Sequence, residues 1–298
     1  MTAGPGAPAD DPALRPPRID AHQHFWRYDQ REYGWIDERM GRLRRDFLPG
    51  ELKGELDRVG FDGCVAVQTC PSLAETRWLL ELADRHPFIL GVVGWVDLQS
   101  PAAREELQDV ASHPKLVGVR HGVQDEPDES FLLRPEFGRG IALLESFGLA
   151  YDILIYPRHL RVATDFVRRF PGVRFALDHV AKPEIRNGEI RDWARDLRAL
   201  ASLPNVVCKL SGLVTEADWD RWTPEDLEPC LEVAFDGFGP ERLLIGSDWP
   251  VCTLAADYAR TLGVVMDYLA PRPEAEGDAV LGLNALRFWR LASQEGRT

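Results

Sequence analysis

The feature that most constrains the fold of this chain is an alternation of short apolar runs with longer amphipathic runs. Each apolar run has the length and composition of a buried parallel strand, and each amphipathic run has the period of a helix that covers it. The pairing recurs eight times along the 298 residues. Eight strand-then-helix units of this size predict an α/β fold, a closed (β/α)8 TIM barrel.

The expected elements follow one another in strict order. We expect strands at residues 18–20, 61–69, 89–97, 116–120, 150–155, 173–178, 206–210 and 243–246. We expect helices at residues 48–59, 72–85, 101–111, 135–147, 160–170, 190–203, 224–238 and 255–269. Ser72 and Glu75 have the spacing of a capping box at the start of the second helix. A last amphipathic segment at 282–291 is expected to close or cap the structure.

A doubly wound open sheet is the structural alternative. It is disfavoured because no GxGxxG sequence follows the first strand. No Gly/Ser linker or compositional break separates the two halves, so residues 18–298 are predicted to form one domain. Residues 1–17 are rich in Pro, Ala and Asp and lack a hydrophobic signal core, which predicts a flexible leader.

Charge and cysteine content limit the partners and the compartment. The formal net charge is −13 and no dense Lys/Arg block occurs, which argues against nucleic acid and an anionic membrane surface as partners. No apolar run approaches the ~20 residues that span a bilayer. The five cysteines have no CxxC spacing, so we predict free thiols and a cytoplasmic location. The sequence leaves open whether the protein forms a homo-oligomer.

The candidate catalytic and metal-binding residues fall at the ends of the predicted strands. His22 and His24 are two residues apart, so on a strand their side chains share one face. His179 follows the sixth strand and Asp248 the eighth. In a closed barrel the first and last strands are neighbours, and functional residues sit at the carboxyl ends of strands. We therefore expect three imidazoles and one carboxylate to converge, a set that can bind Zn²⁺ or activate water.

Each of these residues also has an ordinary structural interpretation. The histidines could be hydrogen-bonded residues of the barrel rim, and Asp248, which precedes Trp-Pro, could be a turn or cap residue. Arg120 and Lys209 could be structural ion pairs, or they could hold the oxygens of a polar substrate. Four aromatic residues could pack over the barrel mouth or face a substrate: Trp26, Tyr28, Tyr33 and Trp35.

Seven stretches carry a resemblance to a known family. They are DAHQHFW (20–26), GVRHGVQDEP (118–127), LAYDILIYPRHL (149–160), ALDHVAKP (176–183), CKLSGLVTEA (208–217), ERLLIGSDWPV (241–251) and NALRFW (284–289). Together they span nearly the whole predicted domain. The chain resembles the amidohydrolase superfamily, in the amidohydrolase-2 branch that includes sugar lactonases.

The resemblance implies a TIM barrel of the metal-dependent hydrolase type and hydrolysis of a sugar-acid lactone to the free acid. The catalytic residues would be His22, His24, His179 and Asp248, with Asp248 activating water. The substrate, a small sugar lactone, would be bound by Arg120, His121, Lys209, Tyr156, Trp35 and Lys182.

Two other functions stay open. A metal-dependent decarboxylase of an unsaturated or aromatic acid would need cations for the substrate carboxylate, and Arg120, Arg158 and Lys182 could supply them. A non-catalytic sugar-acid-binding barrel is the other alternative, although binding alone would not need Asp248 as a base.

The metal content is the remaining question at the level of sequence. The superfamily generally uses one or two divalent ions, but some lactonases of this branch work without metal. Strand four offers Arg120 where a bridging lysine would be needed for two ions. We therefore expect either no metal or one divalent ion, Zn or Mn, held by His22, His24, His179 and Asp248.

Overall fold

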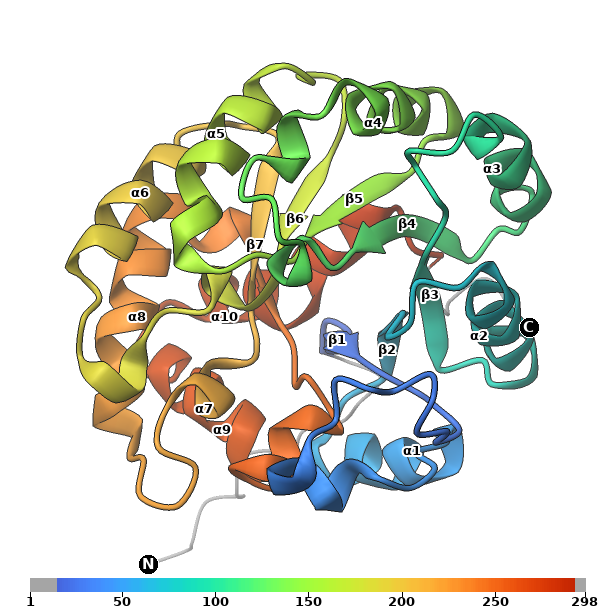
Figure 1. The fold of residues 1–298 in the computed structure, drawn as a ribbon. Helices are drawn as coiled ribbons and strands as arrows, with labels where there is room; N and C mark the ends of the chain where they lie inside the picture. The colour runs from blue at the N-terminus through green and yellow to red at the C-terminus, as the bar shows by residue number, and fades with distance from the viewer. Residues whose placement is uncertain (1–14, 293–298) are drawn as a thin grey trace, which may run out of the picture.

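The computed structural model describes residues 15–292 and shows a parallel barrel surrounded by helices (Figure 1). The eight strands are hydrogen-bonded in chain order. They are β1 (Ile19–Gln23), β2 (Gly63–Val67), β3 (Ile89–Gly94), β4 (Leu116–His121), β5 (Ala150–Ile153), β6 (Phe175–Leu177), β7 (Val206–Leu210) and β8 (Leu243–Ile245). The predicted fold class is confirmed, and every predicted strand position holds a strand.

The barrel closes where β1 meets the segment that follows β8. A parallel bridge joins Gln23 to Trp249. The backbone N–H of Asp248 donates to the His22 carbonyl at 2.8 Å, and the N–H of His24 donates to the Trp249 carbonyl at 2.7 Å. Asp20 accepts hydrogen bonds from the Ser247 N–H at 2.9 Å and the Ser247 hydroxyl at 2.6 Å. These bonds bring the first and last predicted site segments together, as expected from closure.

Helices form the outer ring in Figure 1. They are α1 (Pro49–Val59), α2 (Leu73–Arg85), α3 (Ala103–Ala111), α4 (Pro135–Phe147), α5 (Leu160–Arg168), α6 (Arg191–Ala201), α7 (Leu213–Glu216), α8 (Pro224–Phe238), α9 (Tyr258–Leu269), α10 (Glu274–Asp278) and α11 (Asn284–Trp289). The bounds of α4 and α8 are those predicted. α9 begins three residues later than predicted because residues 251–254 form a separate 3-10 turn and Asp257 caps the helix by accepting from the Arg260 N–H.

The capping box predicted at the start of α2 is only half present. Ser72 accepts from the Glu75 N–H, as predicted. The Glu75 carboxylate does not return to Ser72 but accepts from the backbone N–H groups of Thr69 and Cys70 at 3.0 and 2.9 Å. It therefore fixes the loop after β2, which a pattern of sequence spacing could not indicate.

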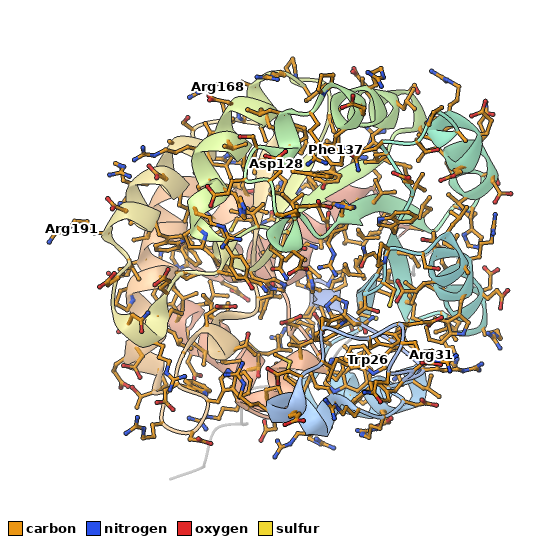
Figure 2. All side chains as sticks on the ribbon, viewed as in Figure 1. Trp26, Arg31, Asp128, Phe137, Arg168 and Arg191 are labelled. Carbon is orange, nitrogen blue, oxygen red and sulfur yellow. The ribbon has the colours of Figure 1, made fainter. Side chains whose placement is uncertain are left out.

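The apolar interior has two parts. A large cluster packs the strands against the surrounding helices, and Phe137 of α4, labelled in Figure 2, belongs to it. A smaller cluster fills the barrel itself, and we call it the inner cluster. Its buried members are Ile19, Ala21, Val65, Val67, Val93, Val117, Ala150, Ala176, Val207, Leu244, Ala285, Trp289 and Leu291. Because the last three come from the C-terminal segment, the predicted closing role of this segment is confirmed.

Arg168 and Arg191 project away from the ring of helices in Figure 2. All five cysteines are buried and free, as predicted. No helix within residues 15–292 is long and apolar enough to cross a membrane. Of the predicted leader, residues 1–14 lie outside the described residues, and Arg15 pairs with Asp62 at 2.8 Å.

Candidate active site

The four residues predicted to converge do so at the carboxyl end of the barrel. The Nε2 atoms of His22 and His24 are 3.2 Å apart. Asp248 Oδ1 lies 3.2 Å from His24 Nε2, 3.8 Å from His22 Nε2 and 4.0 Å from His179 Nε2. All four side chains are buried or nearly so. Three imidazole nitrogens therefore face a single carboxylate oxygen.

The tautomer of His24 follows from its partner. His24 Nδ1 lies 2.7 Å from the carbonyl oxygen of Val67, and a carbonyl can only accept. Nδ1 therefore carries the proton, and in the neutral ring Nε2 presents a lone pair. This lone pair points at Asp248, itself an acceptor. Two acceptors 3.2 Å apart favour a shared proton or a cation between them.

Burial sets the protonation states of this group. It lowers the pKa of His179 to about 4 and lowers the pKa of His22 well below its ordinary value. Burial alone would raise the pKa of Asp248, but His179 and His24 outweigh it and hold that pKa well below its ordinary value. At neutral pH the carboxylate of Asp248 is therefore ionised, and the rings of His22 and His179 are neutral.

The backbone at two of these residues is strained. The run from His179 to Lys182 has four consecutive non-glycine residues with φ between 51° and 58°, and Asp248 has φ 57°. Such residues cost on the order of 1–3 kcal/mol each and persist where surrounding contacts hold them. Trp193 holds the run by donating from Nε1 to the Val180 carbonyl at 2.7 Å. The run turns both His179 and Lys182 toward the same pocket.

Gly212 is required by the position of His179. A Cβ on Gly212 would lie 2.6 Å from His179 Nδ1, and its φ of +68° is in the left-handed region. The neighbouring Ser211 hydroxyl is 2.9 Å from the same Nδ1. The loop after β7 therefore fixes the ring plane of His179.

Directly beneath the four residues, and in contact with His22, is a buried charged layer made of Arg120, Asp152, Asp178 and Lys209. Lys209 Nζ contacts Asp152 Oδ2, lies 2.9 Å from Asp178 Oδ1 and lies 3.1 Å from His22 Nδ1. Arg120 pairs with Asp178 at 3.0 Å. Although burial would raise the pKa of Asp178, Lys209 and His22 hold it well below its ordinary value. Two cations thus balance two carboxylates.

Lys209 lies apart from the other predicted substrate-binding residues. Its side chain is completely buried, and it is absent from the lining of the pocket above the site. The structure therefore does not bring Lys209 into the pocket with the other predicted substrate-binding residues. The alternative, a structural ion pair, is what the structure contains. Lys209 acts on the site through His22.

A pocket of about 530 Å³ opens above the four residues, a volume typical of small-molecule sites. Several predicted site residues line it: His24, Trp35, Arg120, His121, Tyr156, His179, Lys182 and Asp248. Trp35 is the exposed one, at 39%. Its neighbours Trp26 and Tyr33 are buried, so the loop after β1 both packs and reaches the pocket.

Several pocket residues were not singled out from the sequence. The carboxylates are Glu32, Asp125, Glu126 and Glu216, and a further aromatic residue is Trp219. Glu126 accepts from His121 Nε2 at 2.7 Å, because the Trp95 indole donates to the other ring nitrogen at 3.3 Å. Glu126 and Glu216 both lie in stretches that carry the family resemblance, but the sequence does not tell which side chains there face the pocket.

The donor set fits one divalent metal ion. The ligand atoms of His22, His24 and Asp248 lie within 4.8 Å of one another. A tetrahedral zinc site with bonds of about 2.0 Å separates its ligands by about 3.3 Å, close to the observed spacing between the two Nε2 atoms. The Val67 carbonyl on His24 Nδ1 is the outer hydrogen bond that a metal-binding imidazole usually has. His179 Nε2 lies 4.0 Å from Asp248 Oδ1 and falls outside this group of three.

Comparisons with known proteins agree with this geometry. Residues 19–291 match the family described as Amidohydrolase. The chain is 42% identical to an L-fucono-1,5-lactonase of Burkholderia multivorans (92% of this chain, 96% of that protein). It is 40% identical to an L-fucono-1,5-lactonase of Burkholderia ambifaria (94% and 97%). A crystal structure of a Burkholderia multivorans amidohydrolase with bound zinc superposes with a TM-score of 0.90 at 42% identity, covering 93% of this chain and all of that one.

Proposed function

We propose that this chain, which belongs to the amidohydrolase family, hydrolyses the ring ester of a sugar-acid lactone to the free aldonic acid. The L-fucono-1,5-lactonases are its relatives at 40–42% identity over nearly the whole chain, and L-fucono-1,5-lactone is the first substrate to test. The observation that carries the proposal is the ionised Asp248 facing three imidazoles at the base of a pocket. Ester hydrolysis needs a base for water and donors for the developing oxyanion, and this site has both.

Asp248 is the proposed general base. Its carboxylate takes a proton from a water molecule, and the water oxygen attacks the lactone carbonyl carbon. The low pKa of Asp248 keeps the carboxylate ionised across the working range of pH. The strained backbone and the bond from its N–H to the His22 carbonyl fix the carboxylate in position.

In the metal-free site, Arg120 and His179 are the proposed donors to the oxyanion. Both line the pocket, and Arg120 is held by Asp178 at 3.0 Å. When the Ser211 hydroxyl donates to His179 Nδ1, the neutral ring carries its proton on Nε2, which faces the pocket. Collapse of the tetrahedral intermediate breaks the bond to the ring oxygen, and protonated Asp248 returns its proton to that oxygen.

We propose that His22, His24, His179 and Asp248 hold at most one divalent ion, zinc or manganese. Such an ion would act as a Lewis acid on the carbonyl oxygen. A lactone is an activated ester, so base and cationic donors alone are expected to retain substantial activity. Metal analysis of purified protein and kcat/KM before and after chelation test this. Two tightly bound ions, or complete loss on chelation with full recovery on adding zinc, would contradict it.

The decarboxylase alternative has weaker support from the geometry. It requires cations free to bind a substrate carboxylate. Arg120 and Arg158 already pair with carboxylates, at 3.0 and 3.5 Å. The Glu216 carboxylate, 4.0 Å from Lys182, would repel a substrate carboxylate that approaches this lysine. The binding-only alternative gives no reason for an ionised, strained Asp248 above buried imidazoles.

The test is a pH-indicator assay of the purified protein against a panel of sugar lactones, with carbon dioxide release from aromatic acids measured in parallel. We expect acid release from a hexono-lactone that depends on Asp248. Carbon dioxide release without lactone hydrolysis would identify a decarboxylase.

We also propose that residues 18–298 form one domain. We further propose that the protein works in the cytoplasm, and fractionation of the source cells tests this location.

A further inference from the structure

Lys182 and Glu216 form a widely spaced ion pair on the wall of the pocket. Lys182 Nζ and Glu216 Oε1 are 4.0 Å apart, and the side chains are only 17% and 24% exposed. Both line the pocket. Within residues 15–292 neither charged head group has a hydrogen-bond partner. Two largely buried charges therefore face the pocket without a hydrogen bond to another residue of the described chain.

Two other charge pairs at this pocket are closed. Arg120 lies 3.0 Å from Asp178, and His121 lies 2.7 Å from Glu126, both at hydrogen-bond distance. The 4.0 Å gap between Lys182 and Glu216 is too long for a direct hydrogen bond. A group that accepts from the ammonium and donates to the carboxylate would bridge this gap.

Both residues are held in place by the fold. Lys182 ends the left-handed run after β6, with φ 51°, and its ammonium lies 5.3 Å from the ring centre of Tyr156. Glu216 ends α7, a helix held by bonds from the Thr215 hydroxyl to Gly212 and from the Trp219 indole to Thr215. A strained segment that aims a side chain at a pocket is a reason to look for a function of that side chain.

The charge of the pair selects the kind of group that binds there. A lysine alone would attract an anion, and a glutamate alone a cation, but together they are neutral. A hydroxyl is both donor and acceptor, so one hydroxyl can accept from Lys182 and donate to Glu216. A sugar lactone has several such hydroxyls, whereas a simple lactone has none.

We propose that Lys182 and Glu216 form a hydroxyl-recognition subsite that makes the enzyme selective for polyhydroxylated lactones over unsubstituted ones. This inference rests on the proposed lactonase function and adds its specificity. Lys182 was already a candidate substrate-binding residue from the sequence, and Glu216 is its partner. A site built to hydrogen-bond a hydroxyl discriminates strongly against a substrate that lacks it, because the site's polar groups are then left unpaired.

The experiment compares two substrates, L-fucono-1,5-lactone and δ-valerolactone, which has the same ring size and no hydroxyl. The variants are Glu216→Gln and Lys182→Met, each measured for kcat and KM with both substrates. Glu241→Gln is the matched control, because Glu241 also pairs with a cation, Arg287 at 2.8 Å, but does not line the pocket.

We expect each site variant to lose about tenfold or more in kcat/KM for the sugar lactone, mainly through KM, and less than about twofold for δ-valerolactone. The control is expected to change neither. Equal losses on both substrates, or no loss on either, would overturn the subsite while leaving the lactonase function intact. If the unaltered protein hydrolyses no sugar lactone, the proposed function itself fails, and the subsite with it.

Discussion

The barrel interior has a lower part, the apolar inner cluster, and an upper part, the charged layer. Both parts are buried, but they are built from opposite kinds of side chain. Along β5, β6 and β7, the inward positions run from Ala150 to Asp152, from Ala176 to Asp178 and from Val207 to Lys209. The first residue of each pair belongs to the apolar inner cluster, and the second, two residues nearer the carboxyl end, belongs to the charged layer. The two layers touch, since Lys209 Nζ lies 5.3 Å from the ring centre of Trp289.

The difference shows which layer serves stability and which serves chemistry. Burial of apolar side chains stabilises the fold by roughly 25 cal/mol per Å². A buried ion pair brings little net stability, because desolvation offsets the attraction between its charges, but removing one partner is strongly destabilising. The charged layer is therefore best explained by its contact with His22 and, through Arg120, with the pocket.

Lys209→Met should have the largest effect on stability. It leaves Asp152 without its cation and removes one of the two cations of Asp178, with both carboxylates fully buried. We expect a loss of about 3–5 kcal/mol in the free energy of unfolding, together with a loss of kcat/KM. Urea denaturation measures the first. Lys53→Met is the control, because Lys53 pairs with Asp57 on the surface and should contribute no more than about 1 kcal/mol. Equal effects of the two variants would show that the charged layer is not a coupled unit.

Leu244→Ala tests the lower layer alone. Leu244 is fully buried in the inner cluster, and its truncation should remove about 2–5 kcal/mol from the free energy of unfolding. Below the melting temperature, kcat/KM should stay within about twofold of the original value. A large loss of kcat/KM in the folded variant would mean that the two layers are mechanically linked and that our separation of their roles is wrong.

Glu75 gives a smaller, pH-dependent test at the edge of the upper layer. Burial raises its pKa from 4.5 to about 7, although Thr69 and Cys70 donate to it. A raised folded-state pKa means that stability is full below about 4.5 and is lost as pH rises through about 7. At 1.36 kcal/mol per unit, the loss is up to about 3 kcal/mol.

The measurement is the free energy of unfolding between pH 4.5 and 8 for the original protein and for Glu75→Gln. Because other groups titrate in this range, the difference between the two curves is the relevant quantity. We expect the original protein to lose more stability than the variant as pH rises. Parallel curves would show that Glu75 is not buried as an acid.

Most of the fold could be predicted because its determinants are local. A buried parallel strand must be apolar on both faces, so runs such as 206–210 and helices such as 135–147 and 224–238 are visible in the sequence and have the predicted bounds. The structure departs from the prediction where a tertiary contact sets the local hydrogen bonding. The Glu75 carboxylate, for example, accepts from the loop after β2 and not from Ser72.

The site could be predicted in part, for a similar reason. Barrel closure places strand ends together, so the convergence of His22, His24, His179 and Asp248 follows from topology. The depth of a side chain below the pocket does not follow from topology. Lys209 and Arg120 both lie near strand ends, yet one is beneath the pocket and the other lines it. Glu216 is in a short helix after β7, and nothing in its spacing indicates that it faces Lys182.

The most direct test of the account is the turnover of L-fucono-1,5-lactone by Asp248→Asn. The amide keeps the shape of the side chain but cannot take a proton from water, so kcat should fall by at least ~10². Asp236→Asn is the control. Asp236 is an exposed residue of α8 that pairs with Arg198 of α6, so its substitution should leave kcat unchanged. Circular dichroism and thermal unfolding establish that both variants fold. A folded Asp248→Asn variant with turnover close to that of the original protein would contradict the assignment of Asp248 as the base.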